Sequence, residues 1–347
     1  MSLEALIHAR LPLPAAEVMA LALYHPEHGY YRQTTGPWGF EGKDYYTALD
    51  LGPLLGATLA LRLEGAWERL GRPARFVALE PGAGRGWLGR DLLAAASGAF
   101  AEALTYVHRD DNPAAHGAAE AALEPYLASG RARFVSESEA LDPFEGCVFS
   151  NELFDALPAQ PWRWDGQRWV REVLTESGPE WQPFDHAESR GWFESQGEGL
   201  EVGDGSVWAE GLPGLVQSCL APLKAGLFLA IDYGQAADHL LAKGADLRRY
   251  KGHTVDGRWS EDLGTTDLTA DVDFTRLQGL VENAGLGDTT HRSLSQWIRQ
   301  HAPLMQWESD WQDLDARTRV ARMQNLLQLT MPGMMGERFR VLEGWRG

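Results

Sequence analysis

A strand that runs into a glycine-rich turn is the feature that most limits how this chain can fold. Residues 76–93 read FVALEPGAGRGWLGRDLL, an apolar run that breaks into four glycines and then resumes with helical spacing. Glycine adopts positive φ freely and lets backbone approach a neighbouring group closely. The stretch therefore predicts a buried strand, a tight turn shaped around a ligand, and a helix.

Strands and helices alternate beyond this turn. Strands are expected at 74–80, 103–110, 131–137, 145–150 and 226–234, and helices at 86–96 and 114–130. Because the strands are mostly apolar, the alternation predicts an α/β fold with a parallel, doubly wound sheet that helices cover on both faces.

Longer segments interrupt the alternation. The interval before the strand at 226–234 is too long for one crossover, and its Asp165-Gly166 turn predicts an inserted hairpin. We expect one core domain with insertions and no second independent domain. The expected divisions are an N-terminal helical segment with a lid loop at 1–72, a core at 73–347, insertions at about 159–205 and 235–270, and a helical segment at about 295–335.

Charge and cysteine content narrow the classes of partner. The chain has 49 acidic and 31 basic residues, a formal net charge of −18, which repels nucleic acid and anionic lipid and favours basic partners. No apolar run is long enough to span a bilayer, and the N-terminus shows no secretory core. Only two cysteines occur, so no disulfide framework is expected. We expect a cytoplasmic protein without nucleic-acid binding or membrane insertion; nothing in the pattern specifies an oligomeric state.

Two phosphate ligands are possible for the glycine turn. A P-loop requires lysine and a hydroxyl residue after its last glycine, whereas Gly89 is followed by Arg90 and Asp91, which excludes a triphosphate cradle. A dinucleotide site requires G-x-G-x-x-G, and residues 84–89 have that spacing. Its phase is poor, because the acid Glu80 and two further residues separate the strand from the first glycine of that motif.

A third ligand, S-adenosylmethionine, carries an ammonium group and a sulfonium centre but no phosphate. The motif E-x-G-x-G-x-G at 80–86 would offer it the Glu80 carboxylate, and Asp110, ending the next strand, can accept both ribose hydroxyls. This pattern is typical of class I methyltransferases; a tight turn without a ligand is the alternative. The residues predicted to bind the cofactor are Thr47, Glu80, Gly82, Ala83, Gly84, Leu88, Asp110, Asp111 and Asn151.

Further motifs occur in a fixed order along nearly the whole chain. They are ALYHPEHGYY (22–31), GKDYYTALDLGPLLG (42–56), LEPGAGRGWLGRDLL (79–93), SNELFDALP (150–158), AIDYG (230–234), DLTADVDF (267–274) and RFRVLEGW (338–345). This series closely resembles the MidA-like family of S-adenosylmethionine-dependent methyltransferases. The resemblance implies a class I methyltransferase sheet with an antiparallel last strand, and a protein substrate with a basic or arginine-containing segment. The mitochondrial members of that family are complex I assembly factors that dimethylate an arginine of a respiratory subunit.

The chain departs from the family pattern at several positions. The family's Thr-Ala/Ser-Pro-Glu is Thr47-Ala48-Leu49-Asp50 here, and the Ala-His of the late motif is Ala270-Asp271. These differences bear more on the identity of the substrate than on cofactor binding.

The segment SNELFDALP offers two acids for the chemistry. Glu152 and Asp155 would share one face if a helix began here, and such a carboxylate pair can grip a guanidinium and aim one of its nitrogens. Acids favoured by a helix dipole are the alternative. We predict Glu152 and Asp155 as catalytic. The residues predicted to bind the substrate are Asp44, Tyr45, Tyr46, Asp232 and Tyr233, with aromatic packing as the alternative for the tyrosines of the loop.

Four functions remain open from the sequence. The leading one is a protein methyltransferase acting on arginine, an interpretation that the resemblance implies and the composition permits. The others are a small-molecule methyltransferase, a non-catalytic assembly protein that binds S-adenosylmethionine, and a nicotinamide-dependent oxidoreductase. No His/Cys/carboxylate cluster at ligand spacing is evident, so no metal is expected.

Overall fold

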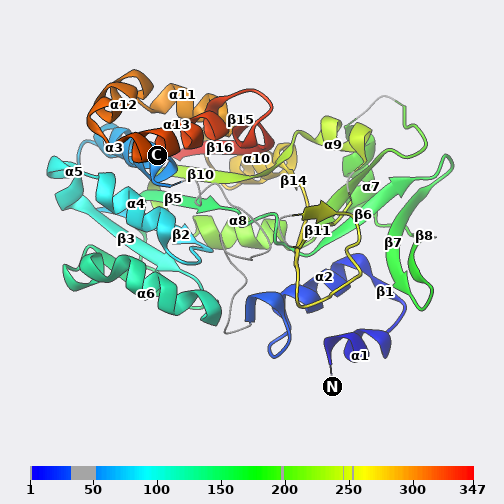
Figure 1. Ribbon diagram of the computed structural model, residues 1–347. Coiled ribbons are helices and arrows are strands. Elements are labelled where there is room, and N and C mark those ends of the chain that lie inside the picture. Colours follow the sequence, from blue (N-terminus) through cyan, green and yellow to red (C-terminus); the bar gives the residue numbers. More distant parts are fainter. Residues whose placement is uncertain (1, 33–51, 197–198, 245, 252–253) are drawn as a thin grey trace. The chain divides into compact units, whose positions relative to one another are not determined.

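The chain divides into two compact units, whose segments alternate along the sequence. The computed structural model describes residues 2–32, 52–196, 199–244, 246–251 and 254–347 (Figure 1). The sheet unit comprises Thr47–Leu153, Val216–Asp232 and Gln278–Gly347, and the insertion unit comprises Met1–Tyr46, Phe154–Leu215 and Tyr233–Leu277. The insertion unit contains both predicted insertions, and helix α3 (Leu54–Arg69) belongs to the sheet unit.

The main sheet has eight strands and is mostly parallel. Seven of them follow the order β15 (Gly287–Ser293), β16 (Phe339–Arg346), β10 (Leu223–Gln235), β5 (Phe144–Asn151), β2 (Phe76–Pro81), β3 (Leu104–Arg109) and β4 (Ala132–Val135). The pairs from β10 to β4 are parallel, β15 and β16 pair antiparallel, and β14 (Val272–Asp273) pairs with the end of β10. The predicted doubly wound sheet is confirmed.

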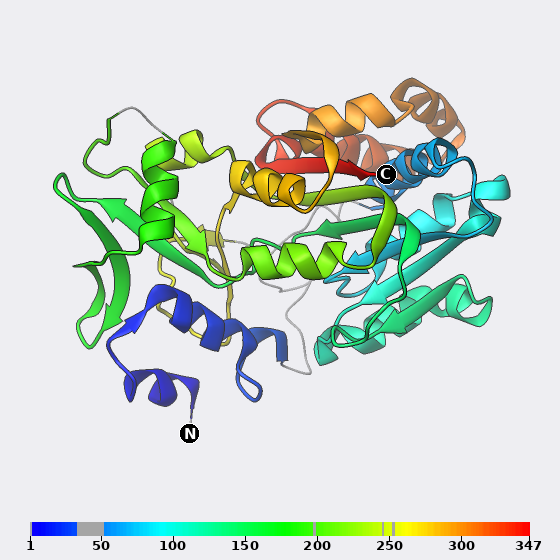
Figure 2. The same ribbon diagram turned by 180° about the vertical axis from the view of Figure 1, so that it is seen from behind.

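The apolar strands are buried because helices flank the sheet. All six residues of β2 are buried. Helix α6 (Pro113–Ala128) has Asn112 as its N-cap and Pro113 at its first position, and it runs beside β4 in the view from behind (Figure 2). The other helices of the sheet unit are α4 (Trp87–Ala95), α5 (Gly98–Ala103), α11 (Leu294–His301), α12 (Leu304–Asp310), α13 (Ala316–Thr330) and α14 (Met335–Arg338). The chain passes from the insertion unit to the sheet unit within α8 (Leu212–Leu220) and again within α10 (Phe274–Asn283). In the part of the chain that the structure describes, no helix combines the length and apolarity needed to cross a bilayer.

The insertion unit is built on antiparallel strands. Its larger sheet contains β1 (Leu13–Pro14), β6 (Ala159–Trp164), β7 (Trp169–Thr175), β8 (Gly178–Pro183) and β9 (Gly205–Ala209), and its smaller one contains β11 (Arg248–Lys251), β12 (Thr254–Asp256) and β13 (Asp267–Thr269). The predicted hairpin is confirmed, since β6 and β7 pair across a turn in which Asp165 accepts hydrogen bonds from two backbone N–H groups. Its helices are α1 (Leu3–His8), α2 (Ala15–Tyr24), α7 (Ala187–Ser195) and α9 (Ala237–Lys243).

Two apolar clusters hold this unit together. One joins α1 and α2 to residues distant in sequence, including Trp259, Leu268 and Ala270. The other, called the aromatic cluster below, consists of four aromatic side chains and one leucine: Trp162, Trp169, Phe193, Trp208 and Leu241. Several of the chain's 14 tryptophans are therefore core residues.

Gly89 fixes how closely helix α4 approaches strand β3. A Cβ atom at Gly89 would lie 2.1 Å from Cζ of Tyr106, far inside van der Waals contact. We expect Gly89→Ala to lower the free energy of unfolding by about 1–3 kcal/mol, because the buried ring has to shift. Urea denaturation measures the change.

Gly117 provides the matched control. It is exposed in α6 with nothing near its Cβ position, so Gly117→Ala should raise stability by about 0.5–1 kcal/mol through helix propensity. Equal effects of the two substitutions would show that contact with Tyr106 does not require the glycine.

Candidate active site

The turn after β2 depends on glycine for its shape. Gly82, Gly84 and Gly86 have φ angles of 66°, 51° and 67°, in the left-handed region that other residues rarely adopt. At Gly82 a Cβ would also lie 2.7 Å from Cδ1 of Leu153. The turn and the segment after β5 therefore approach each other closely within the sheet unit.

The backbone donors of the turn are already used within the chain. The N–H groups of Gly82 and Ala83 point to the Arg109 carbonyl, at 2.9 and 3.4 Å, and that of Gly86 donates to the Ala83 carbonyl at 2.9 Å. The N–H of Gly84 donates to an Asp110 carboxylate oxygen at 2.7 Å. A pyrophosphate cradle requires N–H groups directed at the ligand. This pairing disfavours a dinucleotide.

The Glu80 carboxyl is buried instead of exposed at the turn. Its side chain is 2% exposed and accepts a 2.5 Å hydrogen bond from the Tyr106 hydroxyl. Burial raises the pKa of Glu80 to about 8, so the carboxyl is largely neutral at pH 7. Through this hydrogen bond Glu80 ties β2 to β3 beneath the turn, and its role in binding the cofactor stays a prediction.

Asp110 joins the ends of two strands beside a cavity. Its carboxylate accepts from Gly84 and from the backbone N–H of Asn112, at 2.7 and 2.6 Å. Next to it lies a cavity of about 420 Å³, a volume suited to a small ligand. The lining residues are Asp110, Asp111, Asn112, Pro113, His116, Phe134, Val135, Ser136 and Glu139. The predicted acid thus lies where a ribose and an attached ring could bind together.

Polar groups gather where β5 and β10 end. Asn151 donates to Oε1 of Glu152 at 2.9 Å, while its own buried Oδ1 makes no hydrogen bond to any residue the structure describes. Asp232, fully buried, accepts from the backbone N–H of Leu153 at 3.1 Å. An unpaired buried acceptor is costly, so Oδ1 of Asn151 is suited to a donor such as the cofactor's ammonium group.

No helix follows β5, which corrects the prediction for Glu152 and Asp155. Glu152 has a φ of 54°, its N–H donates to the Ile231 carbonyl, and the chain turns irregularly until β6 begins at Ala159. The shared helix face is therefore absent, and so is the helix dipole invoked as the alternative. The two acids also belong to different units, Glu152 to the sheet unit and Asp155 to the insertion unit.

Asp155 lies in a polar network of the insertion unit. Its carboxylate accepts from the Thr269 hydroxyl at 2.9 Å, and burial raises its pKa to about 6. Nearby, Arg248 and Lys243 both pair with Asp271, at 2.7 and 3.3 Å. Asp271 stands where the family motif has histidine, and it serves here as an ion-pair partner.

The remaining residues predicted to bind the cofactor or the substrate lie in different parts of the chain. Ala83 and Leu88 are buried beside the turn, and Asp111 accepts from the N–H of Glu137 at 3.2 Å. Tyr233 is partly buried at the end of β10. Asp44, Tyr45, Tyr46 and Thr47 lie outside the described residues.

Sequence reasoning missed two residues of β3. Tyr106 holds Glu80, and Nε2 of His108 lies 2.9 Å from the Gly84 carbonyl oxygen. Together with Asp110 they alternate along one strand, which places them on one face of the sheet. This alternation of Tyr106, His108 and Asp110 is the sequence signal that could have identified them.

The parallel sheet, the glycine turn after β2 and the acid at the end of β3 define the class I methyltransferase fold. A family described as "Putative S-adenosyl-L-methionine-dependent methyltransferase" matches residues 58–290. The chain belongs to this family, the resemblance to MidA-like proteins is confirmed, and the cofactor is S-adenosyl-L-methionine.

Similar proteins agree with this assignment. The chain is 27% identical to "Protein arginine methyltransferase NDUFAF7 homolog, mitochondrial" of Drosophila melanogaster, over 99% of this chain and 84% of that protein. Two Burkholderia thailandensis crystal structures share the fold at 24% identity. One, described as a "likely methyl transferase" bound to S-adenosyl-homocysteine, has a TM-score of 0.87 and covers 99% of this chain and 92% of its own. The other, a native structure of a protein described as uncharacterized, has a TM-score of 0.84 with 99% and 91% covered.

The buried Glu80 makes stability depend on pH. Its pKa is raised from 4.5 to about 8 in the folded protein, so the folded state keeps a proton that the unfolded state releases between these values. Stability therefore falls as pH rises across this window. Glu80→Gln keeps a neutral acceptor for Tyr106, and we expect it to gain on the order of 3 kcal/mol relative to wild type between pH 5 and pH 8.

Urea denaturation at both pH values measures this difference. Glu102→Gln, at an exposed glutamate of α5, is the control and should follow wild type. Parallel curves for wild type and Glu80→Gln would contradict a neutral Glu80.

Proposed function

We propose that this methyltransferase acts on an arginine side chain of a protein substrate. The observation that carries the proposal is the group formed by Asn151, Glu152 and Asp232 at adjoining strand ends, next to the glycine turn of the sheet unit. In open α/β sheets, ligands bind at the carboxyl ends of the strands near such a turn. Acids at this place suit a cationic acceptor.

The cofactor residues would divide their tasks by chemistry. Asp110 would accept the ribose hydroxyls, with the adjacent cavity for the adenine ring. Asn151 would accept from the ammonium group of the methionine end through its unsatisfied Oδ1. Gly82, Ala83 and Gly84 would allow the ligand to approach the backbone. Thr47 and Leu88 remain predicted contacts.

The acids would orient the acceptor and manage its proton. When bound, the cofactor would supply a methyl group activated on a sulfonium for transfer to one guanidinium nitrogen. Glu152 would hold the guanidinium fork and localise its charge on the other nitrogens. The attacking nitrogen must lose a proton to a base, and Asp155 stays a predicted catalytic residue.

Two observations support a protein as the substrate. The Drosophila relative is named as a protein arginine methyltransferase. The net charge of −18 favours a basic segment, although it does not identify one. Asp44, Tyr45, Tyr46, Asp232 and Tyr233 remain the predicted substrate contacts.

Asp110 provides a test of the cofactor site. We expect Asp110→Asn to weaken binding of S-adenosyl-homocysteine about 10- to 100-fold, because charge-assisted hydrogen bonds to the ribose are lost. Calorimetric titration measures this. Asp142→Asn, an exposed acid before β5, should bind as wild type does. Thermal stabilisation by NAD, but not by S-adenosyl-homocysteine, would overturn the cofactor assignment.

Glu152 and Asp155 provide the test of the chemistry. We expect Glu152→Gln and Asp155→Asn each to reduce transfer of labelled methyl groups to lysate proteins at least about 100-fold, because each removes the charge of a predicted catalytic carboxylate. Binding of S-adenosyl-homocysteine should change little. Glu124→Gln, exposed in α6, is the control.

The outcomes separate the competing functions. Undiminished labelling by Glu152→Gln would remove Glu152 from the mechanism. Labelled small molecules without labelled protein would indicate a small-molecule methyltransferase. A wild-type protein that binds cofactor yet labels nothing would be a non-catalytic binding protein, and analysis of labelled peptides for methylarginine tests the residue specificity.

A further inference from the structure

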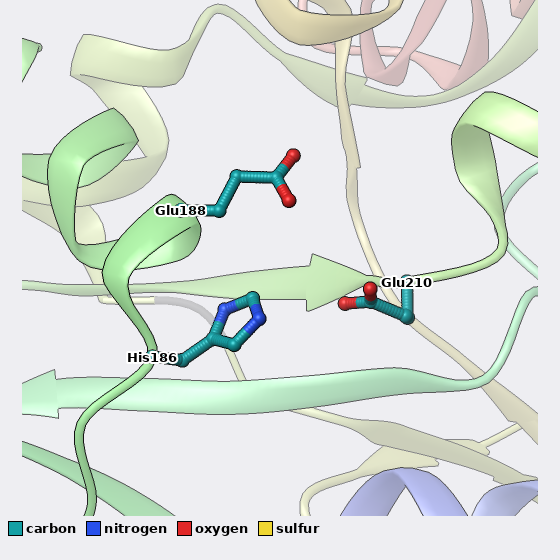
Figure 3. A group of neighbouring side chains, drawn as sticks. All are labelled: His186, Glu188 and Glu210. Atoms are coloured by element: carbon teal, nitrogen blue, oxygen red, sulfur yellow. The ribbon is translucent and has the colours of Figure 1, made fainter.

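Three potential metal ligands converge where helix α7 begins and strand β9 ends. His186 is the N-cap of α7, Glu188 lies in its first turn, and Glu210 directly follows β9. One ligand atom from each side chain lies within 4.8 Å of the others (Figure 3). All three belong to the insertion unit, whereas the predicted cofactor residues Asp110 and Asn151 belong to the sheet unit.

His186 is oriented by a partner outside the group. Its Nδ1 accepts a 3.3 Å hydrogen bond from the Ser189 backbone N–H as the N-cap of α7, and it lies 3.0 Å from the Ser189 hydroxyl oxygen. The Ser189 hydroxyl donates to the His186 carbonyl, so its oxygen can also accept a hydrogen bond. Metal binding through Nε2 would move the ring proton to Nδ1, which would then donate to this oxygen in place of the capping bond.

Glu210 is held in a similar way. One of its carboxylate oxygens accepts a 2.8 Å hydrogen bond from Nε1 of Trp208, a buried member of the aromatic cluster. Two of the three candidate ligands thus have an orienting partner, and these partners come from α7 and from β9. Such support limits the reorganisation that metal binding would require.

The local charge favours a cation. The carboxylates of Glu188, Glu210 and Asp273 each attract the positive charge of Arg276 electrostatically. The Arg276 guanidinium lies 3.3 Å from the centre of the Trp208 ring. The guanidinium donates to the Ala209 carbonyl, and no hydrogen bond joins it to Glu188 or Glu210 in the described chain. One positive charge faces several carboxylates, so a divalent ion would balance the remainder.

We propose that His186, Glu188 and Glu210 form a binding site for a divalent transition-metal ion, with Zn²⁺ as its best-matched occupant. One imidazole and two carboxylates suit Zn²⁺ better than Mg²⁺, which prefers oxygen ligands alone. Three protein ligands leave a position for water. The ion would tie the start of α7 to the end of β9 and stabilise the insertion unit.

Titration calorimetry of the full-length chain, freed of metal with chelator, tests the proposal. We expect Zn²⁺ to bind at a saturable site and Mg²⁺ to bind at least about tenfold more weakly. His186→Asn retains a helix-capping side chain, and Glu188→Gln and Glu210→Gln retain shape. Each should weaken Zn²⁺ binding at least about tenfold.

Glu194→Gln is the matched control, because Glu194 is exposed on α7 outside the group. It should bind Zn²⁺ as wild type does. Thermal unfolding with and without Zn²⁺ is the second readout, and the upward shift seen for wild type should disappear in the three ligand variants. The ten histidines of the chain make such variants necessary.

The site would be refuted by two results. One is a wild-type chain without saturable Zn²⁺ binding. The other is binding that the three ligand variants leave unchanged, which would assign the ion to different side chains. Equal affinity for Mg²⁺ together with insensitivity to His186→Asn would exclude the imidazole as a ligand.

Discussion

The attachment of the glycine turn to the end of β3 is the constraint on which the cofactor site depends. The Arg109 carbonyl and the Asp110 carboxylate together take three N–H groups of the turn, and positive φ angles allow the backbone to reach them. This attachment places Asp110 beside the turn, where it also lines the cavity together with Phe134 and Val135 of β4. Because these N–H groups are already paired within the chain, they are not directed at a phosphate, and the turn therefore disfavours a phosphate-bearing ligand.

The neutral pair formed by Glu80 and Tyr106 shows how this turn can coexist with an acid beneath it. A charged carboxylate in an apolar interior would be strongly destabilising, whereas a protonated one that hydrogen-bonds to a phenol is tolerated. Both side chains are buried, and α4 approaches the Tyr106 ring closely at Gly89. Glu80, which the sequence suggested as a charged group near the ligand, is thus a buried group that links two strands.

Much of the sheet was predictable from the sequence because its strands are short, apolar and separated by turn residues. The strand at 76–81, the hairpin around Asp165 and the position of Asp110 follow from such local signals. The state of Glu80 was not predictable, because it depends on Tyr106 from another strand. The irregular path after Glu152 was likewise missed, since its cause is pairing with Ile231 and Asp232 far along the chain.

The metal-ligand group was hidden for the same reason. His186 and Glu188 are neighbours in sequence, but Glu210 joins them only because β9 returns to the start of α7. The spacing of residues along the sequence cannot predict that β9 brings Glu210 to the start of α7. The family motifs, in contrast, are continuous segments and are therefore visible in the sequence.

The register of the shortest strand has a consequence for biosynthesis. Leu13 of β1 pairs with Leu174 of β7, and the helices on either side of β1 share a core with Leu268 and Ala270. During synthesis these residues must therefore wait for most of the following polypeptide before their partners exist. Apolar side chains such as Val18 and Leu23 stay uncovered during that delay, which makes this nascent segment a natural client for chaperones.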